Sequence, residues 1–132
     1  MEKLNVRTLI LSDIHLGNKN SKNKEVVKLL KNTNCEKLIL NGDIVDAWSL
    51  MRNGKWTKND TKFFRQILKM SYEHNTEIIY LRGNHDEFIE HVAPFVFNNF
   101  KIVKEYYHTD LHGKKFYVIH GDIFDVITKN LK

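Results

Sequence analysis

The chain has 132 residues, of which 42% are hydrophobic and 28% are charged, and its formal net charge is +5. These values are typical of one globular domain with a core of its own. No apolar stretch of the sequence approaches the roughly 20 residues that span a bilayer, and the first residues lack the long apolar region of a signal peptide. The single cysteine, Cys35, excludes an internal disulfide framework and is expected to be a small buried residue just before a strand. We therefore expect a cytoplasmic protein.

The first half of the sequence predicts alternating strands and helices. The expected strands are 6–12, 37–40 and 77–81, which are short runs rich in Leu, Ile, Val or Tyr. One helix is expected after Ser21, which would be its N-cap, and a second from about residue 60 to residue 74, where apolar residues recur at helical spacing. The residues before the second helix, up to about Thr57, are expected to form a loop. This βαβαβ order is typical of a parallel sheet covered by helices.

The last third of the sequence is predicted to be rich in strands. A short helical stretch is expected after Asp86, and Pro94 marks a boundary because proline breaks a helix interior. The expected strands are 100–103, 105–110 and 115–119. Residues 111–114 would join the last two strands as a hairpin turn around Gly113. The sequence predicts an α/β fold in one domain, residues 1–132, with no linker between its two parts.

Four apolar runs in the chain stop at residue types that bind metals. The runs are LILSDIH, LILNGDIVD, IIYLRGNHD and YVIHGDIFD. The candidate ligands at their ends are Asp13, His15, Asp43, Asn84 and His120. Because ligands bind beyond the carboxyl ends of strands in open α/β sheets, we expect these side chains to share one site. Asp13 and His15 would alternate along an extended segment, which would point both at one ion.

The mixture of side chains at these strand ends predicts the chemistry of the site. Carboxylate, imidazole and amide ligands suit Mn²⁺, Zn²⁺ or Fe²⁺ better than Ca²⁺, and better than Mg²⁺ alone. Asp43 is the central candidate to bridge two ions, roughly 3.5–4 Å apart, that activate water and neutralise a phosphoryl group. His85 would then donate a proton to the leaving oxygen, and Asp46 would orient His85. Ordinary polar roles are expected for the other histidines, which are His74, His91, His108 and His112.

Together these motifs resemble the calcineurin-like metallophosphoesterase superfamily. The motifs are Asp13-Ile14-His15, Gly42-Asp43-Ile44-Val45-Asp46, Gly83-Asn84-His85-Asp86 and His120-Gly121-Asp122. The resemblance implies a β-sandwich flanked by helices, with a dinuclear metal site at the strand ends. It implies two divalent ions as cofactors, with Mn²⁺ as the expected metal and Zn²⁺, Fe²⁺ or Mg²⁺ as alternatives.

The resemblance also implies a role for each residue of the site. Asp13, His15 and Asp43 would hold the first metal. Asp43, Asn84 and His120 would hold the second metal. In the same way, the leaving-group acid would be His85, supported by Asp46.

A finer resemblance concerns residues 13–17, 43–48 and 120–125. They are similar to the branch named for UDP-2,3-diacylglucosamine diphosphatase, which cleaves the pyrophosphate of a UDP-linked lipid precursor at the membrane surface. This implies a phosphate-containing small molecule or lipid-linked nucleotide as substrate, and peripheral contact with the inner membrane surface. Typical enzymes of that branch carry Arg at the position of His85, so the broader His-bearing relatives match better. Trp48 is expected either to form a wall of the substrate site or to pack against the core.

Lysines gather in two segments of the sequence. They are Lys19, Lys22, Lys24, Lys28, Lys31, Lys55, Lys58 and Lys62. Solvated helix faces are the favoured interpretation, and a positive surface for phosphate-bearing substrates, nucleic acid or anionic membrane is the alternative. A nuclease of the same superfamily and a non-catalytic scaffold on this fold therefore stay open as alternative functions.

The end of the chain departs from the family pattern. Family members carry a Gly-His-x-His element after the fourth motif, and nothing after Asp122 matches it. We therefore expect a fragment of a longer protein, and a truncated product with a half-built site is the alternative. Weak metal binding and little activity are expected of this chain on its own. A sandwich without its closing strands also predicts an exposed sheet edge and oligomerisation through that edge.

Overall fold

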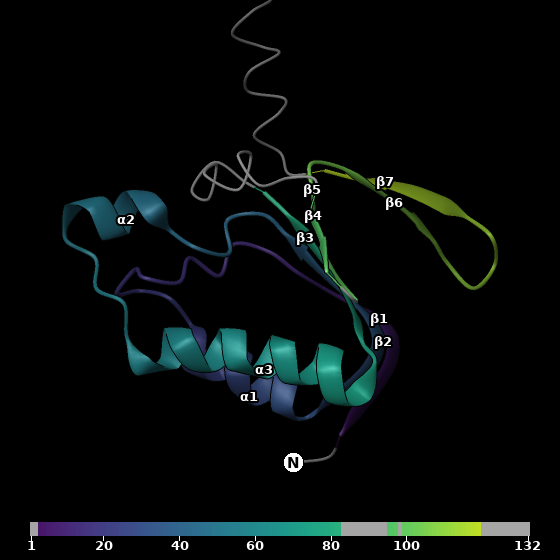
Figure 1. Cartoon of the computed structure of the whole chain (residues 1–132), viewed down its shortest axis with the longest axis horizontal. Helices are drawn as coiled ribbons and strands as arrows, with labels where there is room; N and C mark the ends of the chain where they lie inside the picture. Colours follow the sequence, from purple (N-terminus) through teal and green to yellow (C-terminus); the bar gives the residue numbers. More distant parts are fainter. Residues whose placement is uncertain (1–2, 83–94, 98, 120–132) are drawn as a thin grey trace, which may run out of the picture.

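The computed structural model of the chain describes residues 3–82, 95–97 and 99–119. The elements in chain order are β1 (Leu4–Leu11), α1 (Asn23–Lys31), β2 (Thr33–Asn41), α2 (Ala47–Arg52), α3 (Lys58–His74), β3 (Glu77–Leu81), β4 (Phe95–Phe97), β5 (Phe100–Val103), β6 (Tyr106–Thr109) and β7 (Lys115–Val118). They form a mixed α/β fold with a parallel sheet flanked by helices, which confirms the predicted fold class (Figure 1). None of the described helices is long and apolar enough to cross a bilayer.

The main sheet has the strand order β1-β2-β3-β5-β4. Neighbours among β1, β2, β3 and β5 pair in parallel, and β4 pairs with β5 antiparallel. Helices α1 and α3 connect successive parallel strands and pack against each other on one face of the sheet (Figure 1). Parallel pairing brings the carboxyl ends of β1, β2 and β3 to the same edge of the sheet, where ligands of open α/β sheets bind.

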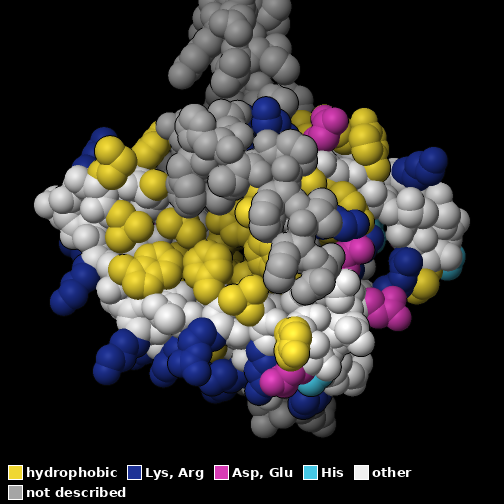
Figure 2. Space-filling model, viewed as in Figure 1, with side chains coloured by type: hydrophobic (Ala, Val, Ile, Leu, Met, Phe, Trp, Pro, Cys, Tyr) yellow, Lys and Arg dark blue, Asp and Glu magenta, His cyan; other side chains and the backbone are white. Residues whose placement is uncertain are grey.

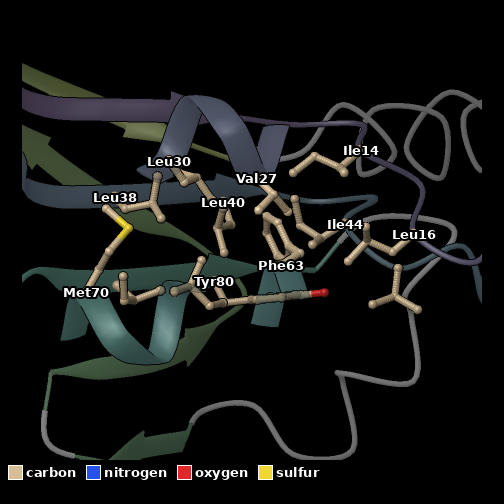
Figure 3. Packing of buried hydrophobic residues seen from close by; sticks show 13 residues of the cluster. Ile14, Leu16, Val27, Leu30, Leu38, Leu40, Ile44, Phe63, Met70 and Tyr80 are labelled. Carbon is tan, nitrogen blue, oxygen red and sulfur yellow. The ribbon is translucent and has the colours of Figure 1, made fainter. Parts of the chain in front are cut away.

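The main core lies between the sheet and the two long helices. Strand side chains of β2 and β3 meet helix side chains that recur every three or four residues along α1 and α3 (Figure 3). The fully or almost fully buried members are Val27, Leu30, Leu38, Leu40, Phe63, Ile67, Met70, Ile78 and Tyr80. Burying a side chain of this size stabilises the fold by about 1.5–3 kcal/mol before the entropy of ordering it is counted. Helix α3 begins at a capping box, in which Thr57 and Asp60 bond each other's backbone N–H groups.

A second, two-stranded sheet covers part of the opposite face. β6 and β7 form an antiparallel hairpin whose turn contains Gly113 at φ 82°. Tyr106 and Val118 of this hairpin pack on a second cluster of main-sheet side chains, which comprises Ile39, Ile79 and Leu81. Two sheets are therefore stacked, with helices on the outer face of one, as the predicted sandwich flanked by helices requires.

Several predicted elements are confirmed, and others were missed. The strands 77–81 and 100–103 and the second helix lie where the sequence predicted them. Two elements were not predicted: α2, which interrupts the expected loop, and the short strand β4. The helical stretch expected after Asp86, and the boundary at Pro94, lie outside the described residues.

Two expectations about local structure are wrong. Ser21 does not cap α1, because Lys22 occupies the N-cap position and the Ser21 hydroxyl donates to the Ile14 carbonyl at 2.6 Å. Cys35 lies inside β2 rather than before it, since β2 begins at Thr33 and pairs with the first residues of β1. Burial raises the pKa of the half-buried Cys35 thiol.

Candidate metal centre

The loops after β1 and β2 are held together by their backbones. Asp13 N–H donates to the Gly42 carbonyl at 3.1 Å, and His15 N–H donates to the Asp43 carbonyl at 2.9 Å. In return, Asp46 N–H donates to the Leu16 carbonyl at 2.8 Å. These bonds continue the β1–β2 pairing past the ends of both strands, so the two loops form one unit at the sheet edge.

Apolar residues between the candidate ligands anchor this unit to the core. Ile14 lies between Asp13 and His15, and Ile44 follows Asp43 directly. Ile14 and Ile44 are almost fully buried, and they lie with buried Leu16 at one end of the core cluster (Figure 3). The buried apolar side chains therefore hold the two loops against the core, and the polar side chains between them lie at the edge of that core.

The backbone at the candidate ligands is left-handed. Asp13, His15 and Asp43 have φ values of 56°, 54° and 52°. Among the described residues, the one other non-glycine residue with positive φ is Asn75, the C-cap of α3. The expectation that Asp13 and His15 alternate along an extended segment is therefore wrong, because the loop turns to pair with residues 42–45. Such conformations cost of order 1–3 kcal/mol each and cluster at functional sites.

The side chains of Asp13, His15 and Asp43 converge. One ligand atom from each lies within 4.8 Å of the others, and Asp13 Oδ1 is 3.6 Å from His15 Nε2. Exposure falls from Asp13 through His15 to Asp43, which is only 6% exposed. Two carboxylates and an imidazole at this spacing fit a divalent metal ion of the Mn²⁺, Zn²⁺ or Fe²⁺ type.

Asp46 holds the imidazole of His15 from the other side. Its Oδ2 lies 3.2 Å from His15 Nδ1 and accepts from the Asn18 amide at 3.2 Å, and its Oδ1 accepts from Ser49 N–H at 2.9 Å. A carboxylate on Nδ1 leaves Nε2 facing Asp13, which is the usual arrangement behind a histidine that binds a metal. Sequence reasoning missed this contact, although an Asp directly before Ala47 is the N-cap signal that places Asp46 at the start of α2.

A cleft of about 480 Å³ opens beside these residues. Asp13, His15 and Asp46 line it, together with Lys22 from the segment before α1. Lys22 is the one cation among the described residues that line the cleft, and its positive charge would favour an anionic ligand there.

Asn84, His85 and His120 lie outside the described residues. Among the described residues, β3 ends at Leu81, and the Asn41 side chain at the end of β2 donates to the Ile119 carbonyl at 3.2 Å. Their predicted roles, and that of Asp46 toward His85, stay predictions.

The remaining candidates fall at other places in the fold. His74 ends α3, and His112 lies in the hairpin turn. His108 is buried on the inner side of β6, where burial first and then the Lys37 and Arg7 charges lower its pKa. None of these three belongs to the group formed by the metal candidates, and His91 lies outside the described residues. Trp48 is 43% exposed on α2, and its predicted role at a substrate site stays a prediction.

Comparison with known families agrees with these motifs. The family model for calcineurin-like phosphoesterases matches residues 6–131. The chain belongs to the calcineurin-like phosphoesterase family. Asp13, His15 and Asp43 therefore converge in a chain of this family, which makes them the candidate metal centre of a phosphoesterase fold.

Two individual proteins are similar to this member of the family. A UDP-2,3-diacylglucosamine hydrolase of Psychromonas ingrahamii (strain DSM 17664 / CCUG 51855 / 37) is 24% identical over 128 residues, which cover 95% of this chain and 51% of that protein. The crystal structure of Pseudomonas putida nuclease MPE aligns with 75% of this chain and 48% of its own, at 23% identity and a TM-score of 0.44. The chain thus spans about half the length of the curated relative that it matches.

Proposed function

We propose that the protein is a metal-dependent phosphoesterase that hydrolyses a phosphodiester or pyrophosphate bond. The observation that carries this proposal is the convergence of Asp13, His15 and Asp43 within 4.8 Å, at the carboxyl edge of the sheet, in a chain of the calcineurin-like phosphoesterase family. Left-handed backbone at all three residues supports it, because the fold accepts a conformational cost at these positions.

Each candidate ligand has a proposed role in holding two metal ions. Asp13 Oδ1 and His15 Nε2 would bind the first ion, and the buried Asp43 would bridge to a second ion held by Asn84 and His120. When bound, two such ions supply an acidified water and neutralise the charge of the phosphoryl group. Because Asp43 is only 6% exposed, its carboxylate is shielded from bulk water, and its attraction to a bound cation would be stronger than at the surface.

Asp46 would act as a positioning residue. Its contact with His15 Nδ1 would fix the orientation of the imidazole ring, so that Nε2 would face the metal together with Asp13. Ser49 N–H and the Asn18 amide hold the Asp46 carboxylate in turn. His85 remains the candidate proton donor to the leaving oxygen, and Asp46 remains the candidate to support it.

A substrate of the UDP-diacylglucosamine type is the candidate within this class. The similarity to a UDP-2,3-diacylglucosamine hydrolase supports it, and Lys22 on the cleft suits a pyrophosphate. Comparing hydrolysis of a UDP-linked diacylglucosamine with hydrolysis of DNA would test it. Cleavage of DNA but not of the UDP-linked lipid would reject this substrate and favour a nuclease.

The proposed chemistry can be tested with a generic diester. Mn²⁺ should stimulate hydrolysis of bis-p-nitrophenyl phosphate by the protein, and Asp43→Asn should abolish that stimulation, because the charge that would serve both ions is lost. Glu36 lies near the start of β2, whereas the candidate metal centre follows the end of that strand, and its side chain is 80% exposed. Glu36→Gln should therefore leave the rate of hydrolysis unchanged. Undiminished hydrolysis by Asp43→Asn would refute the proposal, and absence of any Mn²⁺-stimulated hydrolysis would favour a scaffold.

A further inference from the structure

The outer faces of α1 and α3 carry two stripes of cations. The stripes comprise Lys24, Lys28 and Lys31 on α1, and Lys58, Lys62, Arg65 and Lys69 on α3. Spacings of three and four residues place each set on one face of its helix, and all seven residues are exposed. Because α1 and α3 pack against each other, the stripes lie side by side, and Figure 2 shows Lys and Arg side chains gathered along the lower edge of the view, over these helices.

These cations have few acidic neighbours. In the part of the chain that the structure describes, none of the seven forms an ion pair. The two helices contain three acidic residues, of which Asp60 is buried in the capping box of α3. Like charges four residues apart, such as Lys58 with Lys62 and Arg65 with Lys69, destabilise a helix by about 0.2–0.5 kcal/mol per pair. The arrangement therefore costs stability unless an anionic partner neutralises it.

A shallow groove runs along the α3 stripe. Lys31 of α1 and Lys62, Arg65 and Lys69 of α3 line it. Four further α3 residues line the same groove: Gln66, the acid Glu73 at its far end, and two exposed apolar residues, Tyr72 at 85% and Leu68 at 54%. The surface thus offers a row of cations that ends beside an aromatic ring.

We propose that the cation stripes bind the phosphate backbone of a nucleic acid. Lys58 and Lys69 lie eleven residues apart, which is about 16 Å along the helix. That length matches about five phosphates of one strand of B-form DNA. Tyr72, one turn beyond Lys69, is placed to stack on a base, a contact that needs no particular sequence.

An anionic bilayer fits this surface less well. A helix that lies on a membrane buries an apolar face in the lipid boundary and keeps its cations above it. The apolar faces of α1 and α3 are already buried against the sheet, which leaves Leu68 and Tyr72 as the exposed large apolar residues of these two helices. A polyanion in water needs no such apolar face.

The stripes begin near the candidate metal centre. Lys22 lines the cleft beside Asp13 and His15, and Lys24 opens the α1 stripe two residues later. A nucleic acid along α1 and α3 would therefore reach the centre at one end. The inference concerns binding alone and does not rest on the proposed hydrolysis, so the two can fail separately.

Fluorescence anisotropy with short labelled DNA, in EDTA and over a range of salt concentrations, tests this surface. The protein should bind DNA with an affinity that falls steeply with salt. The triple variant Lys62→Gln/Arg65→Gln/Lys69→Gln should bind at least tenfold more weakly at low salt, and the slope of log affinity against log salt should fall by about 2 to 3. Because these side chains are exposed, an unchanged circular dichroism spectrum is expected and confirms that the variant is folded.

A matched variant separates this surface from net charge. Lys104→Gln/Lys114→Gln/Lys115→Gln removes three charges around β5, β6 and β7 and should bind DNA within about twofold of the wild type. Equal weakening by both triple variants would overturn the proposal, and so would undetectable binding of DNA by the folded wild type. Binding of phosphatidylserine vesicles that the α3 variant abolishes, with DNA binding unchanged, would overturn it in favour of a membrane.

Discussion

The loops at the carboxyl edge of the sheet and the outer faces of α1 and α3 use charge in opposite ways. At the sheet edge, Asp43 and Asp46 are almost fully buried and rest on backbone hydrogen bonds between two loops. On the helices, the cations are exposed, and the structure gives them no ion pair among the described residues. The first region should therefore be sensitive to small changes of shape, and the second sensitive to changes of charge alone.

The largest expected effect on folding comes from Gly54, which packs α2 on the loop that carries Asp13 and His15. A Cβ at Gly54 would lie 2.5 Å from the Gly17 carbonyl oxygen and 2.6 Å from that of Ser49. Because both neighbours are backbone atoms, Gly54→Ala should lower the free energy of unfolding by about 3 kcal/mol in urea titration.

The control for that change is Gly113→Ala. A Cβ at Gly113 would meet nothing within 4 Å, so this variant should cost only the 1 kcal/mol or so of a left-handed backbone. An equal loss of stability in both variants would show that the Gly17 and Ser49 carbonyls can move aside and that close packing of α2 does not constrain residue 54.

The second effect concerns the positioning of His15. Asp46→Asn should weaken Mn²⁺ binding by about 10- to 100-fold in calorimetric titration, because the amide supports the imidazole without a negative charge. Asp110→Asn changes a hairpin carboxylate in the same way and should leave Mn²⁺ affinity unchanged. If Asp46→Asn bound Mn²⁺ as tightly as the wild type, the contact between Asp46 and His15 would not contribute to metal binding.

A smaller effect is expected from His108, buried between β6 and the main sheet. Its pKa lies below the ordinary 6.5, so the unfolded chain takes up its proton first as pH falls. The contribution of His108 to the free energy of unfolding is therefore fully present above pH 6.5. It decreases as the pH falls below 6.5, by at most about 1.4 kcal/mol per pH unit. His108→Gln should remove that decline in urea titrations at pH 7.5 and 5.5, and an identical pH dependence in the variant would contradict the assignment.

The smallest effect should come from the cation stripes. Lys62→Gln/Arg65→Gln/Lys69→Gln should raise the free energy of unfolding by at most about 1 kcal/mol, because the side chains form no ion pair with any described residue and two repulsive pairs are removed. Thermal denaturation followed by circular dichroism measures this. A loss above about 1 kcal/mol would mean that these cations serve the fold rather than a partner.

Apolar patterning made much of this fold predictable from sequence. The runs that form β3 and β5 and the helical spacing of Phe63 and Ile67 marked their elements, because burial of those side chains decides the structure. The strand β4 has only three residues, too few to show a pattern. The six-residue helix α2 lacks an apolar pattern, and it is defined instead by the cap at Asp46 and by the close approach of Gly54 to Gly17 in the neighbouring loop.

The candidate site was predictable in its residues but not in its geometry. Strand ends placed Asp13, His15 and Asp43 together, as the structure shows. Their left-handed backbone and the contact of Asp46 with His15 follow from hydrogen bonds between the two loops, which are tertiary and leave no local pattern. The extent of the domain, the cytoplasmic location and oligomerisation through a sheet edge stay predictions.

The central claim is that Asp13, His15 and Asp43 hold a divalent metal. Isothermal titration of Mn²⁺ into the wild type, Asp43→Asn and Glu36→Gln tests it most directly, since it needs no substrate. We expect saturable binding that Asp43→Asn weakens by at least about tenfold and Glu36→Gln leaves unchanged, with all three proteins equally folded. Equal Mn²⁺ binding by wild type and Asp43→Asn would contradict the claim.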